Sequence, residues 1–273
     1  MSQLTKEIEE HYLQGIEGER LSANEGELER LRTHSILTRF LPPPPAVVLD
    51  IGGGTGIYAF TLARMGYRVH LIDPVELHLE QARSQSHKSG VGLASISPGN
   101  ACKLDFASGT ADSVLLLGPL YHLVERGDRR DALCEAYRVL KPGGVVFAAA
   151  ISRFASLCDG LLRGYFKDPV FRNIVAADLA TGQHRNPTNN PAYFTTAYFH
   201  RPVDLAQEVS EAGFEDVSVL AVEGPAWTAV HFREVWAVAE EREKLMDFLR
   251  LIEKEPSIQG ASAHFIAVAC RRV

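Results

Sequence analysis

The feature that most constrains the fold is a glycine-rich turn between a short apolar run and a helical pattern. Residues 47–51 read VVLDI, and glycine occupies four of the five positions 52–56. An apolar run without alternation is typical of a parallel strand covered on both faces. Glycine lets the backbone come close to a ligand, and the helix expected over residues 57–65 brings its N-terminal N–H groups to the same place. The segment therefore predicts a strand, a nucleotide-type binding turn and a helix.

This segment alone leaves two kinds of cofactor open. Residues 54–59 read GTGIYA and satisfy the G-x-G-x-x-A variant of the dinucleotide fingerprint. A second apolar run, residues 69–73, ends in Asp73, which lies 17 residues after Gly56. An acidic residue at about this distance is common to both kinds of site. The surrounding segments are therefore needed to decide which cofactor the turn binds.

Those segments resemble class I S-adenosylmethionine-dependent methyltransferases. Residues 50–56 read DIGGGTG and fit the D-x-G-x-G-x-G pattern of that family's first motif at every fixed position. Residues 113–123 resemble its fourth strand and following loop, and residues 138–147 resemble the turn into its fifth strand. The resemblance covers residues 40–150 and extends to a plausible end at residues 203–272.

The resemblance implies an α/β chain with a Rossmann-like class I methyltransferase fold, whose seven-stranded mixed sheet carries an N-terminal helical cap and an inserted lid. We expect four segments: a helical cap at 1–41, a cofactor-binding core at 42–150, a substrate lid at 151–202 and the completion of the core at 203–273. Periodic apolar residues support the cap, and the strand–helix rhythm breaks in the lid. The elements expected in the last segment are a helix at 203–212, a strand at 216–222, a helix at 232–253 and a strand at 263–270.

Composition narrows the class of partner. The 273 residues are 46% hydrophobic and carry a net charge of −6 without a basic cluster, so we expect no nucleic-acid partner. No apolar run reaches membrane-spanning length and the N-terminus lacks a signal-peptide pattern, so we expect a cytoplasmic protein that does not enter a membrane. The four cysteines have no CxxC spacing, and we expect no metal site. A monomer or a homodimer is expected.

The resemblance also implies roles for the two acids of the turn. Asp50 would contact the amine of S-adenosylmethionine, and Asp73 would accept from both ribose hydroxyls, because a carboxylate offers two acceptors to two donors. Each has a structural alternative: Asp50 as an acid that stabilises the turn, and Asp73 as a helix cap, since Pro74 follows at a natural first helical position. The full set of cofactor residues expected is Tyr12, Asp50, Gly52, Gly53, Gly54, Gly56, Asp73, Pro74, Asn100, Ala101, Leu117 and Gly118.

Four of these positions are implied less directly. Asn100 stands where the family often has an acidic residue that faces the adenine amine, and its side-chain carbonyl can still accept that hydrogen bond. Leu117 and Gly118 would line the methionyl side of the cofactor, mainly through backbone. Tyr12 stands where related enzymes place an aromatic ring over the cofactor, and simple packing of an amphipathic helix is its alternative.

Methyl transfer from a sulfonium is an in-line displacement, so the protein has to align the reacting atoms and exclude water. A hydroxyl acceptor is helped by a base, whereas an amine or carbon acceptor can need only positioning. The loop at residues 118–122 reads GPLYH and lacks the Asn/Asp-Pro-Pro-Tyr/Phe pattern of enzymes that methylate DNA base amino groups. Within this loop His122 is the expected base, because imidazole titrates near neutral pH; a structural role at the next helix is its alternative.

The expected acceptor pocket lies under the lid, which is rich in aromatic residues and so suits a partly apolar small molecule. The alternative is that these aromatic residues form the lid's own core, and that Trp227 anchors a turn. The expected substrate residues are Tyr121, Tyr193, Phe194, Tyr198 and Trp227.

The sequence thus predicts S-adenosylmethionine-dependent methyl transfer to a small organic acceptor, with the methylated O, N or C atom left open. Two alternatives belong to other classes. One is an NAD(P)-dependent oxidoreductase, against which the chain lacks an obvious Tyr-x-x-x-Lys pair on a helix. The other is a catalytically silent scaffold that keeps the fold and the cofactor site.

Overall fold

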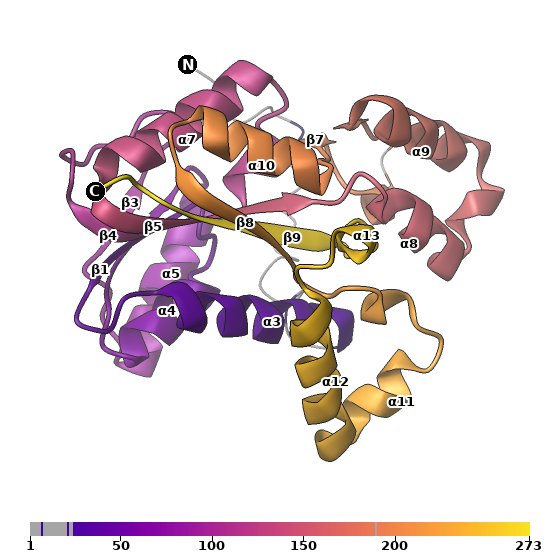
Figure 1. The fold of residues 1–273 in the computed structure, drawn as a ribbon, viewed down its shortest axis with the longest axis horizontal. Coiled ribbons are helices and arrows are strands. Elements are labelled where there is room, and N and C mark those ends of the chain that lie inside the picture. Colours follow the sequence, from indigo (N-terminus) through magenta and orange to yellow (C-terminus); the bar gives the residue numbers. More distant parts are fainter. Residues whose placement is uncertain (1–6, 8–20, 22–23, 189) are drawn as a thin grey trace.

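The computed structural model describes residues 7, 21, 24–188 and 190–273, and its centre is a twisted sheet with helices on both faces (Figure 1). Within the described ranges, seven strands form this sheet in the order β3-β2-β1-β4-β5-β9-β8. The neighbouring pairs from β3 to β5 are parallel, and β9 runs antiparallel to both β5 and β8. The predicted seven-stranded mixed sheet is confirmed. The strands are β1 (Val47–Ile51), β2 (Arg68–Asp73), β3 (Ser95–Pro98), β4 (Ala111–Leu116), β5 (Leu140–Ile151), β8 (Glu215–Ala221) and β9 (His264–Cys270).

Two hydrophobic clusters cover the two faces of the sheet. Helices α7 (Arg126–Val139) and α10 (Pro202–Glu211) contribute to one, and α3 (Asn24–Phe40), α4 (Ile57–Arg64) and α5 (Glu76–Ser89) contribute to the other. Side chains of β1 go to both clusters, because successive residues of a strand point to opposite faces. This double cover explains why the β1 segment is apolar without alternation.

The strand order places a crevice at one edge of the sheet. β1 has β2 on one side and β4 on the other, so the direction in which the chain winds reverses at β1, and loops after β1 and β4 diverge at the carboxyl edge. Because β9 is antiparallel, it enters the sheet at this same edge: its first residue, His264, pairs with Ile151, the last residue of β5. The carboxyl edge therefore collects loops from the first half of the chain and residues from its end.

The inserted segment between β5 and α10 forms a unit with its own core. It contains α8 (Ala155–Arg163), a 3₁₀ turn η1 (Tyr165–Lys167), α9 (Pro169–Thr181), η2 (Pro191–Tyr193) and the short strands β6 (Gln183–His184) and β7 (Ala197–Tyr198). Its buried residues Phe171, Ile174, Val175 and Tyr193 pack on one another. Figure 1 shows α8 and α9 together at one end of the molecule.

The single helix predicted over 232–253 is wrong. The chain instead forms α11 (Phe232–Ala237) and α12 (Ala239–Ile252), with Val238 between them in an extended conformation at φ −96° and ψ 116°. Phe232 and Trp236, four residues apart within α11, stack on each other and pack in one buried cluster with Leu28 of α3, to which α12 adds its own side chains. Glu240 and Glu241 occupy the first turn of α12, where acidic residues favour a helix start.

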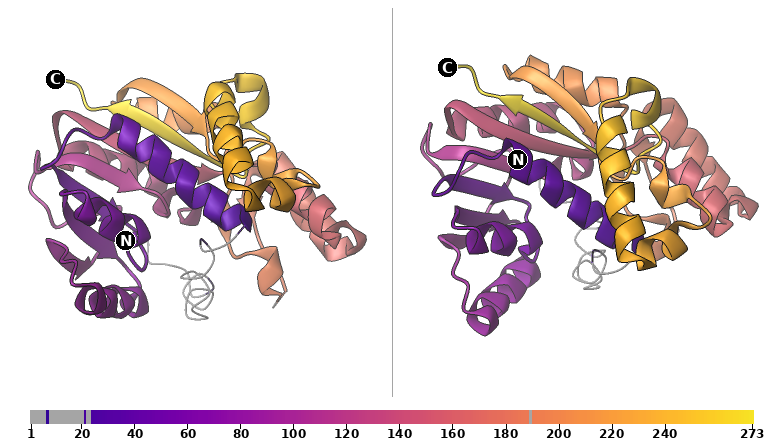
Figure 2. Two further views of the ribbon diagram at one scale, coloured as in Figure 1. Left: turned by 90° about the horizontal axis from the view of Figure 1, so that it is seen from below. Right: turned by 60° about the horizontal axis from the view of Figure 1, so that its bottom comes forward.

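Helix α3 is fixed to the C-terminal helices, beside which it runs in both views of Figure 2. The Arg32 guanidinium, 1% exposed, donates to Glu253 at 2.6 Å and to the Val222 carbonyl at 3.0 Å. Arg39 donates to the other oxygen of Glu253 at 2.6 Å. A short helix, α13 (Pro256–Gln259), then leads into β9.

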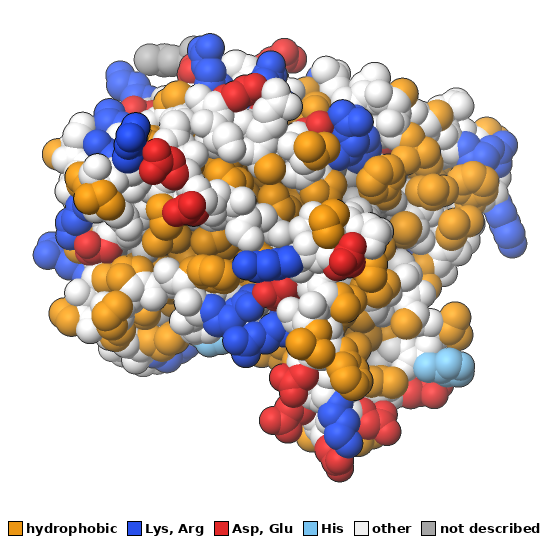
Figure 3. All heavy atoms as spheres, in the orientation of Figure 1, with side chains coloured by type: hydrophobic (Ala, Val, Ile, Leu, Met, Phe, Trp, Pro, Cys, Tyr) orange, Lys and Arg blue, Asp and Glu red, His pale blue; other side chains and the backbone are white. Residues whose placement is uncertain are grey.

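The surface carries charges of both signs. Figure 3 shows acidic and basic side chains interspersed over one face of the molecule. Among the described helices, none has the length and apolar character that crossing a membrane requires.

Candidate functional site

A cavity opens at the carboxyl edge of the sheet, where the glycine turn and the loops after β2, β3 and β4 meet. Every predicted cofactor residue lines it except Gly56 and Tyr12. Gly56 lies just behind the turn as the N-cap of α4, at φ 89°. Tyr12 and the periodic apolar positions of the cap lie outside the described residues. The structure thus brings together residues from 50 to 118 that the sequence had linked only by motif.

Two positions of the glycine turn exclude side chains for different physical reasons. Gly52 has φ +67°, and a Cβ added there would lie 2.7 Å from Cγ of Pro119, so the turn and the loop after β4 are in close contact. Gly54 has φ +58°, and an added Cβ would meet nothing within 4 Å because it would point into the cavity. Both backbone conformations are ones that side chains disfavour.

Asp50 is a buried acid at this cavity. It is 1% exposed, and neither carboxylate oxygen has a hydrogen-bond partner among the described residues. Burial, with the negative charge of Asp73 as a further cause, raises the pKa of Asp50 to about 7, although the nearby Ala59 N–H opposes the shift. An adjacent cation would favour the ionised carboxylate, so this position suits a positively charged ligand group.

Asp73 is tied to the backbone around it. Its Oδ2 accepts from the Gly54 N–H at 2.8 Å, and its Oδ1 accepts from the Val75 N–H at 2.9 Å and lies 3.1 Å from Nδ1 of His78. The helix-cap alternative is wrong, because α5 begins after its N-cap residue Val75, and Asp73 instead closes a short turn through its hydrogen bond from the Val75 N–H. This hydrogen bond is compatible with ribose binding, because each carboxylate oxygen can accept more than one hydrogen bond.

The remaining cofactor positions are set by loops. The side-chain carbonyl of Asn100 accepts from the Cys102 N–H at 2.8 Å and so shapes the loop after β3. Leu117 and Gly118 follow β4, and a Cβ on Gly118 would lie 3.2 Å from the Gly52 carbonyl oxygen. The backbones of the loops after β1 and β4, which flank the crevice, therefore lie close to each other.

Tyr121 and His122 line the cavity from the short helix α6 (Pro119–His122). Their rings are in edge contact with centroids 4.7 Å apart, and the Phe194 ring lies 6.1 Å from that of His122. The loop that follows α6 is held by Arg129, which donates to the carbonyls of Leu123 at 2.9 Å and Val124 at 2.7 Å. This anchoring fixes where His122 stands.

Arg129 belongs to a buried ionic pair. Its guanidinium donates to both carboxylate oxygens of Glu208, at 2.7 and 2.9 Å, and stacks over the Tyr198 ring at 3.7 Å. Hydrogen bonds from His200 and Arg129 outweigh the effect of burial and lower the pKa of Glu208 to about 2. The pair joins α7 to α10 beneath the cavity loop.

The aromatic residues expected to hold the acceptor have different positions. Tyr121 lines the cavity, whereas Tyr193, Phe194, Tyr198 and Trp227 are not among the described residues that line it. Tyr193 packs in the lid's core and its hydroxyl donates to Asp168 at 2.8 Å. Trp227 donates to the Ala261 carbonyl at 2.9 Å, which anchors its turn. The packing alternatives thus describe the contacts of Tyr193 and Trp227.

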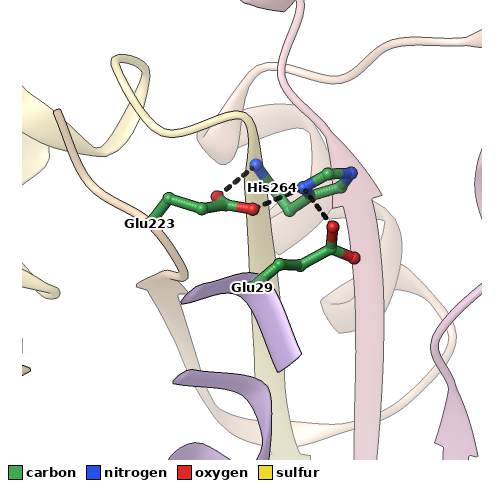
Figure 4. Close-up of side chains that lie close together, drawn as sticks. All are labelled: Glu29, Glu223 and His264. Carbon is green, nitrogen blue, oxygen red and sulfur yellow. Dashed lines mark hydrogen bonds and ion pairs between the residues drawn. The ribbon is translucent and has the colours of Figure 1, made fainter. Parts of the chain in front are cut away.

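Sequence reasoning missed a cluster of three side chains, Glu29, Glu223 and His264, which come from α3, the end of β8 and the start of β9 (Figure 4). Nδ1 of His264 lies 2.6 Å from Oε1 of Glu223 and 3.8 Å from Oε2 of Glu29. Glu29 and His264 line the cavity. The available signal was that Glu223 follows one predicted strand and His264 opens the next, so both stand at the carboxyl edge.

Glu223 is the fixed member of this cluster. It is 2% exposed, and its Oε2 accepts from the His264 backbone N–H at 2.9 Å and from the Ser262 hydroxyl at 2.8 Å. His and carboxylate side chains are also metal ligands. However, two ligands of one tetrahedral zinc stand about 3.3 Å apart if each bond is about 2.0 Å long, and the 2.6 Å separation here is that of a charge-assisted hydrogen bond.

Comparisons with known proteins agree with this geometry. Residues 49–148 match the family described as a methyltransferase domain. The chain is 36% identical over 110 residues to a ubiquinone biosynthesis O-methyltransferase of Methylocella silvestris, covering 39% of this chain and 40% of that protein. It is 30% identical over 192 residues to the protein of the same name from Thiobacillus denitrificans, covering 69% of this chain and 72% of that protein.

The fold is shared with solved structures. A SAM-dependent methyltransferase of Thermotoga maritima, described as a possible histamine N-methyltransferase, superimposes with a TM-score of 0.57 at 18% identity, over 96% of this chain and 98% of that one. The chain spans between 40% and 44% of the length of three of the ubiquinone biosynthesis relatives. The match to the Thiobacillus denitrificans protein nevertheless covers more than two thirds of both chains. The chain belongs to the class I S-adenosylmethionine-dependent methyltransferase family.

Proposed function

We propose that this protein transfers the methyl group of S-adenosylmethionine to a small organic acceptor. Support comes from the family, from the sheet topology and from the cavity at the glycine turn. Ubiquinone biosynthesis O-methyltransferases and C-methyltransferases are both among the relatives, so family likeness leaves the methylated atom open.

The observation that carries the proposal is the pair of buried acids at the turn. Asp50 and Asp73 both line the cavity, and Asp73 already occupies the Gly54 N–H. S-adenosylmethionine brings a cationic sulfonium and an ammonium group, which two carboxylates attract. A nicotinamide dinucleotide brings an anionic diphosphate, which needs the free N–H groups of such a turn; Asp73 occupies the Gly54 N–H, and Asp50 would repel the diphosphate. The acids therefore favour S-adenosylmethionine.

We assign the residue roles of the proposal as follows. Asp50 contacts the cofactor ammonium, Asp73 accepts from the ribose hydroxyls, and Gly54 leaves room for the chain of the methionyl group. Asn100 with Ala101 faces the adenine, and Leu117 with Gly118 borders the methionyl group. Tyr12 is retained as the ring that covers the cofactor. The acceptor enters beside Tyr121 and His122 under the lid, and the protein acts in the cytoplasm as a monomer or homodimer.

Calorimetry on the purified protein tests the cofactor. We expect micromolar affinity for S-adenosylmethionine and S-adenosylhomocysteine and no measurable heat with NADH or NADPH. Binding of a nicotinamide cofactor instead would support the oxidoreductase alternative. Tight binding of S-adenosylmethionine without turnover of any hydroxyl, amine or carbon acceptor would support the silent scaffold.

A further inference from the structure

We infer that His264, oriented by Glu223, is a general base for a hydroxyl-bearing acceptor. The inference rests on the proposed function and adds the class of acceptor and the residue that takes its proton. Three observations carry it: the hydrogen bond that sets the imidazole tautomer, the position of the ring in the cavity, and the carboxylates around it.

The tautomer is set by Glu223. A separation of 2.6 Å between Nδ1 and a carboxylate oxygen requires the proton to lie between them, so Nδ1 is the donor. The neutral ring then carries its lone pair on Nε2, the atom that can accept a proton. Glu223 cannot turn away, because its second oxygen accepts from the Ser262 hydroxyl and from the His264 backbone N–H.

The ring stands on the acceptor side of the cavity. β9 lies two strand spacings from β4, roughly 10 Å across the sheet. His264 pairs with Ile151, three residues beyond Ala148, which pairs with Leu116 at the end of β4. The same cavity is lined by Gly118 after β4 and by His264. The hydroxyl oxygen of an acceptor would lie between Nε2 and the methyl carbon, and the rest of the acceptor would occupy the same cavity.

The two carboxylates near the ring stabilise the imidazolium that forms when Nε2 accepts the proton of the acceptor. Glu223 is in contact with Nδ1 and Glu29 lies 3.8 Å away, so an imidazolium formed during the reaction is attracted by two carboxylates. Arg32 interacts electrostatically with Glu223, but its guanidinium is bound to Glu253. The arrangement of base and orienting carboxylate is the one that activates nucleophiles in other enzymes.

The step balances without a further reactant. The acceptor hydroxyl gives its proton to Nε2 of His264 while its oxygen bonds to the methyl carbon. The carbon–sulfur bond breaks, and its electron pair stays on sulfur to give neutral S-adenosylhomocysteine. The products are a methyl ether and an imidazolium, which later loses its proton to water.

Turnover of two phenols separates proton transfer from simple binding. Unsubstituted phenol keeps its proton at pH 8, whereas 4-nitrophenol is largely ionised there and needs no base. We expect His264→Gln to lower kcat/KM for phenol by about 100-fold or more, in the range typical of a lost general base. For 4-nitrophenol we expect a loss of less than about 5-fold. The control is His231→Gln, which removes an exposed histidine paired with Glu234 and should leave both rates unchanged.

Glu223 acts through the ring and is therefore a positioning residue. Nitrogen NMR of the free protein should show His264 with its proton on Nδ1, and Glu223→Gln should reduce that preference and lower phenol turnover. A proton on Nε2 in the wild type would overturn the inference. So would equal losses for the two phenols in His264→Gln, because the ring would then only shape the site.

The remaining outcomes separate this inference from the proposed function. A wild-type protein that binds S-adenosylmethionine but methylates only amines or carbon contradicts the hydroxyl assignment alone, whereas one that binds it and methylates no acceptor contradicts the proposed function. A protein that does not bind S-adenosylmethionine contradicts the proposed function. Stoichiometric binding of Zn²⁺ to the chelator-treated protein, abolished in His264→Gln, would overturn the base in favour of a metal centre.

Discussion

The Gly54 N–H donates to Oδ2 of Asp73 over 2.8 Å, which joins the glycine turn after β1 to the end of β2. One carboxylate thus shapes the turn and also faces the cavity in which a ribose would lie. Gly54 has no side chain that could make a stabilising contact, so this hydrogen bond fixes the backbone of the turn on the side that faces the cavity.

Replacing Asp73 with Ala should weaken S-adenosylmethionine affinity by at least about tenfold. The change removes hydrogen bonds to a charged group, each worth about 1.5–3 kcal/mol, and leaves the Gly54 N–H without its acceptor. Calorimetric titration measures the loss. Glu76→Gln is the control, since Glu76 pairs with Arg83 at the surface; equal affinities in wild type and Asp73→Ala would remove Asp73 from the site.

Asp50 should make the stability of the ligand-free protein fall as pH rises. Its pKa is about 7 in the fold against 3.8 ordinarily, so the folded state holds a proton that the unfolded chain has lost. The stabilising contribution is present below pH 3.8 and disappears as pH rises through 7, to a total of about 4 kcal/mol at most. Between pH 5 and pH 8, urea unfolding should show a loss of stability for wild type that exceeds the loss for Asp50→Asn by about 1–3 kcal/mol.

The same acid should make cofactor binding pH-dependent in the opposite sense. The ionised carboxylate attracts the cofactor ammonium, and protonation removes that attraction. Affinity for S-adenosylmethionine should decrease as pH falls from 8 to 6 in wild type and stay nearly level in Asp50→Asn. A slope that is the same in both proteins would assign the effect to another group.

Two glycine substitutions should separate stability from binding. Gly52→Ala places a methyl group against Pro119 and should lower stability by about 1–3 kcal/mol through overpacking, in addition to backbone strain. Gly54→Ala meets no protein atom within 4 Å, so its stability cost should be only that of the left-handed backbone, about 1–2 kcal/mol. Its methyl group projects into the cavity, and S-adenosylmethionine affinity should fall. Thermal unfolding and calorimetry on both variants provide the comparison.

Arg129→Met should destabilise the fold by about 3–5 kcal/mol, because it leaves the buried Glu208 carboxylate without its cation. The lowered pKa of Glu208, about 2, means that the pair stabilises the fold above pH 4.5 and that this contribution is lost as pH falls toward 2. The matched control is Arg126→Met on the same helix, whose exposed pair with Glu211 should contribute less than about 1 kcal/mol. Urea unfolding at pH 7 measures both, and similar losses would show that burial does not decide the effect.

The sequence allowed the fold and the cofactor half of the site to be predicted because both depend on local features. Asp50, the glycines and Asp73 fall within one strand–turn–helix–strand unit, and backbone geometry dictates their residue types. Helix 232–253 failed because its break at Val238 comes from packing of Trp236 against α3, which is distant in sequence.

The proposed acceptor side of the site was harder to predict, because it too depends on contacts between residues that are distant in sequence. Glu29, Glu223 and His264 meet only through the tertiary fold, and no spacing along the chain links them. Tyr193 and Trp227 were attractive as substrate contacts because aromatic residues suit apolar ligands, but aromatic residues also fill the cores of small inserted units. Composition does not distinguish the two uses; the hydrogen bonds to Asp168 and Ala261 do.

The reversed direction of β9 has a consequence for how this protein can change over evolution. Since β9 enters the sheet at the edge where β1 and β4 leave it, the proposed donor groups at residues 50–118 and the proposed base with its orienting carboxylate, His264 and Glu223, share one edge of the sheet but are encoded in opposite halves of the gene. Substitution near residues 223 and 264 can alter which molecule is modified while the motif at residues 50–56 stays intact. Selectivity can thus diverge among descendants without loss of the donor site.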